Sequence, residues 1–304
     1  MTSRLPRYRL FGLIVQSDFA LDALPRAAMS PDIHPADVRI VRGADVPAVD
    51  ARDLVASGGS AVLTIPGLAR YTITDGARIL VEAVPDASAR NLRLYLLGSA
   101  FGMLLHQRGS LPLHANAIGI GDHAVAFCGA PGAGKSTIAA WLHDRGHRIL
   151  ADDVCVVETI DGVPTAQAGV PRLRLWRDAL ETSGRDAADF ERSFDDFDKY
   201  DVRTIDTQCD ALPLAAVYRL GRDEATGIRR LSGSAAVEVL IANTYRGEYL
   251  GPMGGTQRHF AQCVALARFV PVFAADRAWG FDRFDAEATR LEAHAREMLS
   301  VRGE

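Results

Sequence analysis

Apolar and polar residues alternate in several short stretches of the first 85 residues, as in β-strands with one buried face. Glycine, proline and aspartate separate these stretches, and such residues form the turns between paired strands. We therefore predict a small, mainly antiparallel β module at the N-terminus. Its expected strands cover residues 8–17, 38–42, 61–65, 70–74 and 78–83.

The pattern becomes helical between residues 88 and 108. Leucine, tyrosine and methionine side chains recur there every three or four positions, as on the buried face of a helix. Glycine and proline in the following Gly-Ser-Leu-Pro run end this helix. We expect the helix to join the β module to a second domain, so that residues 1–108 and 109–304 form two domains.

Strands and helices alternate in residues 109–304, which predicts an α/β domain. Residues 181–204 interrupt this order, because they are rich in Asp, Arg and Ser with interspersed aromatic residues; a long functional loop or short helices are expected there. The expected strands cover residues 113–120, 124–128, 147–153, 154–158, 171–176, 217–220, 229–231 and 271–274, and the expected helices cover 137–145, 235–245, 259–269 and 286–299.

The sequence GAPGAGKS, residues 129–136, lies between an expected strand and an expected helix. Its spacing, G-x-x-x-x-G-K-S, is that of a phosphate-binding loop (P-loop), in which backbone N–H groups surround a polyphosphate, the lysine reaches the β and γ oxygens and the hydroxyl ligates Mg²⁺. The helix dipole also favours an anion at this point. We therefore predict nucleoside triphosphate binding, with Gly129, Gly132, Ala133, Gly134, Lys135, Ser136 and Thr137 as the contacts.

Two aspartates, Asp152 and Asp153, end the strand expected after the P-loop helix, over residues 147–153. Acids at the carboxyl end of such a strand handle Mg²⁺ and the attacking group in P-loop folds. Neighbouring residues of a strand point to opposite faces, so the two acids should have different tasks. We assign Asp153, with Ser136, to Mg²⁺ and Asp152 to the proton of the acceptor hydroxyl; the reverse assignment stays open.

Lysine is rare in this chain, which has only Lys135 and Lys199 among its 34 basic residues other than histidine. An ammonium and a guanidinium are not equivalent beside phosphate, so Lys199 is a second candidate for the site. Arg246 and Arg277 are further candidates for charge on the transferring phosphoryl group or the nucleotide.

Composition excludes several classes of partner. The net charge is −4 and no long basic block occurs, so nucleic-acid binding is not favoured. No apolar run approaches the roughly 20 residues of a membrane-spanning helix, and no signal-type apolar core follows the N-terminus. We expect a cytoplasmic protein that does not enter a membrane. Its four cysteines are widely spaced, which predicts reduced, buried thiols: Cys128, Cys155, Cys209 and Cys263.

His114, the P-loop and the segment RGHRILADD, residues 145–153, occur in register. Together they resemble the catalytic core of HPr kinase/phosphorylase, a bacterial serine kinase with a P-loop fold. The resemblance implies an α/β P-loop kinase domain that uses ATP and Mg²⁺, preceded by the smaller β module. It also implies that His114 lies beside the aspartates, where it orients a carboxylate or assists proton transfer; a core histidine is the alternative. The glycine-rich C-terminal signature of that kinase is not found in this chain.

Three further segments resemble the HPr-kinase-like proteins of bacterial peptide-biosynthesis clusters: YRLFGL at residues 8–13, GVPRLRLW at 169–176 and NTYR at 243–246. Members associated with lasso peptides phosphorylate a serine at the precursor's C-terminus. The resemblance therefore implies a kinase whose partner is a precursor peptide. A kinase for a small hydroxylated metabolite, such as a sugar or amino acid, and a regulatory nucleotide-binding module are the alternatives. ATP against GTP, and assembly into a homo-oligomer, stay open.

Overall fold

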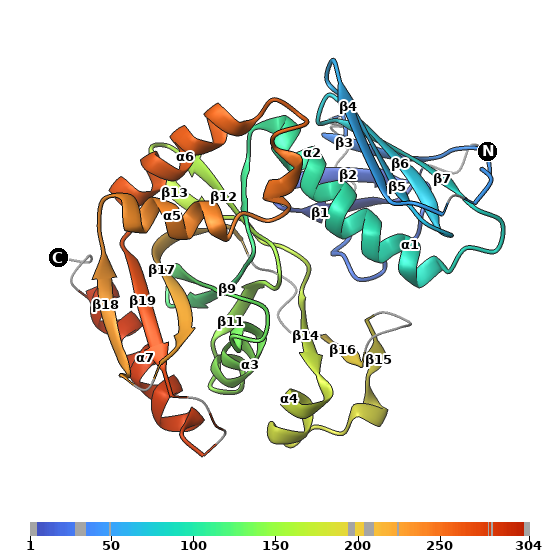
Figure 1. The fold of residues 1–304 in the computed structure, drawn as a ribbon. Coiled ribbons are helices and arrows are strands. Elements are labelled where there is room, and N and C mark those ends of the chain that lie inside the picture. Colours follow the sequence, from blue (N-terminus) through green and yellow to red (C-terminus); the bar gives the residue numbers. More distant parts are fainter. Residues whose placement is uncertain are drawn as a thin grey trace. The chain divides into compact units, whose positions relative to one another are not determined.

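The computed structural model describes residues 5–27, 35–48, 50–193, 198–203, 210–223, 225–278, 280 and 282–300. The chain forms two compact units (Figure 1). The first comprises Met1–Ser110, Ser193–Phe197 and Arg246–His259, and the second Leu111–Arg192, Asp198–Tyr245 and Phe260–Glu304. Residues 246–259, which the sequence prediction placed in the second domain, thus group with the first unit.

The first unit contains a seven-stranded sheet in the order β1-β2-β3-β7-β6-β5-β4. Strand β3 pairs in parallel with β2 and β7, and the other pairs are antiparallel, which confirms a mainly antiparallel module. Strand β4, at one edge of the sheet, was not predicted. The strands are β1 (Arg7–Leu10), β2 (Leu13–Ser17), β3 (Val38–Arg42), β4 (Asp53–Ser57), β5 (Ser60–Ile65), β6 (Ala69–Thr74) and β7 (Arg78–Ala83).

Strands β1 and β2 form a hairpin, so the prediction of one continuous strand over residues 8–17 is wrong. Phe11 and Gly12 turn the chain with φ of 51° and 76°. Two-residue hairpin turns of this kind need positive φ at both positions, which is unusual for phenylalanine. The ring of Phe11 is buried 6.0 Å from that of Phe101, and this packing stabilises the conformation.

The helix predicted over residues 88–108 is present, with a π-helical turn inside it. It consists of α1 (Ala89–Tyr95), η1 (Leu96–Ala100) and α2 (Phe101–Arg108). The Ser88 hydroxyl accepts a hydrogen bond from the Asn91 N–H and caps its start, and Gly109, with φ of 82°, ends it. The Tyr71 hydroxyl of β6 donates to the Leu92 carbonyl at 3.1 Å, which ties the helix to the sheet. A 3-10 turn, η3 (Gly247–Tyr249), also belongs to this unit.

The second unit is organised around β17, the longest strand. It pairs in parallel with β10 and β19 within a nine-stranded sheet, while β9 and β11 continue the sheet beyond β10. This mixed α/β arrangement agrees with the predicted order of strands and helices. The strands are β8 (Leu111–Leu113), β9 (Ala115–Ile120), β10 (His123–Cys128), β11 (Arg148–Ala151), β12 (Cys155–Ile160), β13 (Val163–Ala166), β17 (Leu212–Arg222), β18 (Gly227–Leu231) and β19 (Val272–Arg277).

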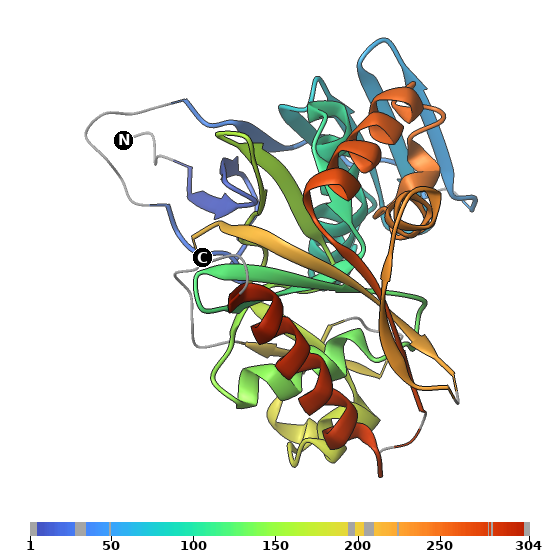
Figure 2. The same cartoon turned by 90° about the vertical axis from the view of Figure 1, so that its left-hand side faces the viewer.

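Helices cover both faces of this sheet (Figure 2). Along β10, Val125 and Phe127 pack with residues of α3 (Lys135–Asp144) and α7 (Phe284–Ser300). Ala124, Ala126 and Cys128 pack on the other face with residues of α5 (Ser234–Ala242) and α6 (Thr256–Phe269). Burial on both faces explains why the strand before the P-loop is a continuous apolar run.

The segment after β14 (Arg172–Trp176) is more ordered than predicted. It contains α4 (Arg177–Thr182), η2 (Ala187–Asp189), β15 (Glu191–Arg192) and β16 (Lys199–Arg203), and β16 pairs with both β14 and β15. The expected loop over residues 181–204 is thus wrong for β16, where buried Tyr200 and Val202 alternate with more exposed residues. The aromatic residues noted at 194 and 197 lie outside the described residues.

Three cysteines, Cys128, Cys155 and Cys263, are buried and take part in no disulfide among the described residues, in agreement with the prediction; Cys209 lies outside the described residues. None of the helices in the described ranges combines the length and the apolar character needed to cross a membrane.

Candidate active site

The P-loop connects the end of β10 at Cys128 to the start of α3 at Lys135. Three of its glycines have positive φ: 139° at Gly129, 77° at Gly132 and 86° at Gly134. A Cβ atom on Gly129 would lie 2.6 Å from the Leu220 carbonyl oxygen, so a larger residue would displace the loop. The glycines at these positions thus permit the compact turn that leads into the helix N-terminus.

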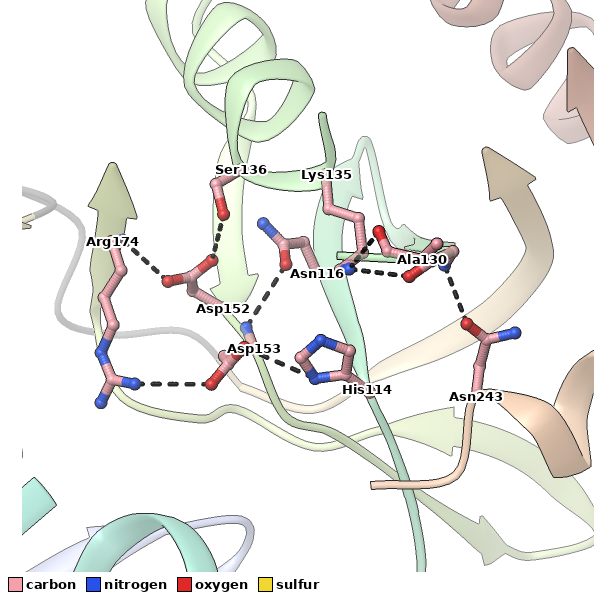
Figure 3. A network of polar contacts seen from close by, with 10 residues as sticks. His114, Asn116, Ala130, Lys135, Ser136, Asp152, Asp153, Arg174 and Asn243 are labelled. Carbon is pink, nitrogen blue, oxygen red and sulfur yellow. Dashed lines mark hydrogen bonds and ion pairs between the residues drawn. The ribbon is translucent and has the colours of Figure 1, made fainter. Parts of the chain in front are cut away.

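The side chain of Lys135 folds back across the loop (Figure 3). Its Nζ donates to the Gly129 carbonyl at 2.8 Å and to the Ala130 carbonyl at 3.4 Å. Burial lowers the pKa of Lys135, and the negative charge of Asp153 acts in the opposite direction. The ammonium is therefore held at the loop by neutral carbonyl oxygens, which an anionic phosphate can replace as partners.

Asp152 directly follows the end of β11 at Ala151 and lies next to Ser136, in the first turn of α3. The Ser136 hydroxyl donates to Asp152 Oδ1 at 3.5 Å, and the backbone N–H of Arg174 donates to Oδ2 at 2.8 Å. Burial raises the pKa of Asp152 to about 6, and the charge of Asp153 adds to this increase. Asp152 is therefore the acid that contacts the P-loop hydroxyl.

Asp153 turns away from Asp152 toward a different set of partners. Its φ is 71°, and its N–H donates to Asn116 Oδ1 at 3.3 Å. Its carboxylate lies 3.5 Å from His114 Nδ1 and 3.4 Å from Arg174 Nη1. Burial by itself would raise the pKa of Asp153, but nearby positive charge, that of Arg174 above all, outweighs burial and the pKa is lowered. Asp153 is thus held as a carboxylate.

His114 belongs to the same network, as the family resemblance implies. It lies between β8 and β9, its N–H donates to the Asn243 carbonyl at 2.7 Å, and its ring stacks on Tyr245 with centroids 5.9 Å apart. Burial lowers its pKa, although Asp153 acts in the opposite direction. A neutral imidazole can donate a hydrogen bond through a ring N–H to the Asp153 carboxylate without neutralising the charge of that carboxylate.

Three residues of this network were not predicted as site residues: Asn116, Arg174 and Asn243. Asn243, at the end of α5, accepts a hydrogen bond from the Gly129 N–H through Oδ1 at 2.9 Å and so ties the loop to a distant helix. Arg174 binds both aspartates. Asn116 lies two positions after His114, on the same side of an extended chain, and Arg174 and Asn243 belong to segments 169–176 and 243–246, which carry the second family resemblance.

The other predicted residues lie in different places. Lys199 of β16 is opposite Trp176 of β14, with Nζ 5.9 Å from the ring centroid. Its charge acts to lower the pKa of both aspartates, against the effect of burial. Arg277 of β19 donates to the Ala133 carbonyl beneath the P-loop. Arg246 belongs to the first unit, where it pairs with Glu248 at 3.5 Å. Thr137 lies in the first turn of α3.

Ser136 and Asp152 fit a magnesium ion that is bound together with a nucleotide. Mg²⁺ is typically held by one or two protein oxygens, phosphate oxygens and water, and these two side chains supply a hydroxyl and a carboxylate within 3.5 Å of each other. In the described part of the chain, no three His, Cys, Asp or Glu side chains are grouped so as to hold a metal by themselves.

Comparisons with known proteins place the chain only loosely. No family model matches it, and no curated protein matches it. Among solved structures, it is similar to the HPr(Ser) kinase/phosphatase from Coxiella burnetii with a TM-score of 0.34 and 14% sequence identity. This match covers 62% of the present chain and 97% of the other. Because the TM-score is low, the function proposed below rests on the geometry of the site.

Proposed function

We propose that this protein is a Mg²⁺- and ATP-dependent kinase that transfers the γ-phosphoryl group to a serine hydroxyl. One observation carries the proposal: a P-loop lysine and serine share one network with two aspartates, of which Asp152 contacts Ser136, Asp153 contacts His114, and both contact Arg174 (Figure 3). Phosphoryl transfer requires phosphate binding, metal binding and orientation of a hydroxyl nucleophile at one place. The two aspartates, Asp152 and Asp153, supply separate groups for the last two tasks.

The metal role fits Asp152 better than Asp153, which reverses the assignment made from the sequence. Asp152 contacts the Ser136 hydroxyl, which is the metal-binding position of a P-loop. Bound Mg²⁺ supplies neutralisation of phosphate charge in this reaction. Lys135 would exchange its loop carbonyl partners for phosphate oxygens, and the N–H groups at the start of α3 would face the same anion.

The proton role then falls to Asp153. The acceptor hydroxyl oxygen forms a bond to the γ-phosphorus, the bond from that phosphorus to the β–γ bridging oxygen breaks, and ADP leaves. The hydroxyl proton passes to a carboxylate oxygen of Asp153. His114 and Arg174 hold this carboxylate from two sides, at 3.5 and 3.4 Å, and so orient it toward the acceptor.

For the acceptor we propose the C-terminal serine of a ribosomally made, lasso-type precursor peptide. This choice rests on the resemblance of residues 8–13, 169–176 and 243–246 to the peptide-cluster kinases. Residues 169–176 include β14, which carries Arg174 and thus adjoins the aspartates. A peptide bound along this strand would lie beside Arg174, which contacts both aspartates.

The test uses the full-length protein with Mg²⁺, ATP and synthetic peptides that end in serine. A matched peptide that ends in alanine is the control, and free serine and a hexose are offered separately. We expect mass spectrometry to detect the addition of phosphate only to the serine peptides, and Asp153→Asn to abolish it. If a free sugar or amino acid is phosphorylated while every terminal-serine peptide stays unmodified, the metabolite kinase is the correct alternative.

A further inference from the structure

Two arginines lie behind the P-loop, on the ends of neighbouring parallel strands. Arg222 ends β17 and Arg277 ends β19, and the two residues are directly opposite each other in the strand register. The Nη2 group of Arg222 donates to the Gly132 carbonyl at 2.8 Å, and that of Arg277 donates to the Ala133 carbonyl at 2.5 Å. Successive carbonyl groups of the loop are thus held from the same side.

These contacts decide where the N–H groups of the loop point. In a trans peptide the C=O and the following N–H point in opposite directions. The Ala133 carbonyl faces Arg277, so the N–H of Gly134 faces away from it, toward the side where a P-loop holds phosphate. The preceding N–H, that of Ala133, is used inside the loop, since it donates to the Ala130 carbonyl at 3.0 Å. Arg277 therefore orients a peptide group of the anion-binding side.

Arg277 is also poorly compensated. Only 7% of it is exposed, its Nε has no hydrogen-bond partner, and no carboxylate of the described residues lies within 4.0 Å of its guanidinium. Burial lowers its pKa, and the more distant Glu287 is the acid that acts against this effect. A buried guanidinium without an ion pair is costly, whereas its binding to a nearby anion is favourable.

A neighbouring arginine, on β17, has the acidic partner that Arg277 lacks. Arg219 of β17 forms an ion pair with Asp276 of β19 at 2.8 Å. Asp276 and Arg277 are neighbours in β19, so their side chains point to opposite faces of the sheet. Arg219, which pairs with Asp276, is therefore on the face away from Arg277. The contrast indicates that the missing partner of Arg277 is a property of its place behind the P-loop.

We propose that Arg277, with Arg222 beside it, is a positioning residue that completes the polyphosphate site from behind the P-loop. Its charge is uncompensated in the nucleotide-free protein and is compensated when the β and γ phosphates enter the loop. This inference rests on the proposed function only in taking the polyphosphate to be that of a nucleotide. It predicts that Arg277 contributes to ligand affinity and contributes nothing to, or lowers, the stability of the ligand-free protein.

The test compares Arg277→Met with the matched control Arg219→Met in the full chain. Calorimetry measures the Kd of Mg²⁺–ADP and of tripolyphosphate, and thermal unfolding measures Tm with and without ADP. For Arg277→Met we expect Kd to rise about 10- to 100-fold for both ligands, because a hydrogen bond to a charged group is lost along with the charge. The ligand-free Tm should stay equal or rise, and the increase of Tm at a fixed ADP concentration should become smaller. Arg219→Met should lower the ligand-free Tm and leave Kd within about twofold.

A structural role would give the reverse result. If Arg277→Met lowers the ligand-free Tm and leaves the Kd of ADP within about twofold of wild type, the proposal is wrong. If Arg277→Met does not fold, Arg222→Met and Arg277→Lys replace it: a rise of Kd of about threefold or more in both supports the proposal, and unchanged values overturn it.

The binding readout also separates this proposal from that of the kinase. If the wild-type protein binds ADP but phosphorylates no acceptor, the kinase proposal is wrong, and the Kd values of the variants still decide the role of Arg277. A wild-type protein that binds neither ADP nor tripolyphosphate overturns the role of Arg277 directly.

Discussion

The geometry of the site predicts a different function for each of the two aspartates, and this prediction is the one that tests the proposed mechanism most directly. Asparagine is nearly isosteric with aspartate, so Asp152→Asn and Asp153→Asn each remove one charge and little volume. The hydrogen bond from the Asp153 N–H to Asn116 uses the backbone and survives both substitutions. Differences between the two variants therefore report the function of each carboxylate.

The expected magnitudes follow from the contacts. Loss of a general base lowers kcat by about 10² to 10⁴, which corresponds to about 3 to 5.5 kcal/mol of barrier. We expect this loss in Asp153→Asn, with the Kd of ADP nearly unchanged, since Asp153 contacts His114 and Arg174 and no P-loop residue in the contacts observed. Loss of groups that merely support a metal site already weakens metal binding by about 10- to 100-fold, so Asp152→Asn should raise the Mg²⁺ concentration at half-maximal rate by at least about tenfold.

The assay follows ADP formation with a terminal-serine peptide at saturating ATP while Mg²⁺ is varied. Rates that recover at high Mg²⁺ in Asp152→Asn, and do not recover in Asp153→Asn, support the assignment. The opposite pattern would restore the assignment made from the sequence, with Asp153 on the metal. Near-normal rates in both variants would show that the carboxylates are structural and would refute the proposed mechanism.

The remaining predictions concern the loop and its supports. Lys135→Ala should abolish nucleotide turnover with an unchanged Tm, and Lys135→Arg should be severely impaired, because a guanidinium does not replace the ammonium between the Gly129 and Ala130 carbonyls; turnover and thermal unfolding check both. Asn243→Ala should weaken ADP binding by about tenfold by calorimetry, because the Gly129 N–H loses its acceptor. Burial acts to raise the pKa of Glu292, but hydrogen bonds from His147, Arg296 and Arg145 outweigh burial and lower the pKa to about 2, so the stabilising effect of Glu292 is present above pH 5 and is lost as pH falls toward 2. Urea unfolding should therefore find Glu292→Gln less stable than wild type by about 2 kcal/mol at pH 7 and equal to it near pH 2.

The parts of the site that are contiguous in sequence were predictable. Residues 124–144 form a strand, a glycine-rich turn and a helix because each step has a local cause: a doubly buried apolar run, glycines at positive φ, and a helix start. The aspartate pair was expected to end the strand over residues 147–153; β11 instead ends at Ala151, and the pair lies directly after it. The partners of each aspartate could not be read in this way, because they depend on how the chain turns at Asp153.

The contacts of the supporting residues could not be predicted, even for Arg277, which was a candidate, because these residues come from elements far away in the sequence. Asn243 reaches Gly129 across 114 positions, and Arg277 reaches Ala133 across 144. Nothing in the sequence near Arg174 indicates that its backbone and side chain bind different aspartates. The hairpin at Phe11 was missed for a related reason: its unusual backbone depends on burial of the ring against Phe101, which is a tertiary contact.

The turn at Asp153 explains how two adjacent acids acquire different chemistry. Had β11 continued, both carboxylates would stay in the extended register of one strand, on its two faces. The strand instead ends at Ala151, and positive φ at Asp153, with its N–H bound to Asn116, carries the chain toward β12. Asp152 is thereby left beside the Ser136 hydroxyl at the start of α3, and Asp153 lies between His114 and Arg174. A local change of backbone direction therefore gives the two adjacent acids different neighbours, and the separate roles proposed for them follow from these neighbours.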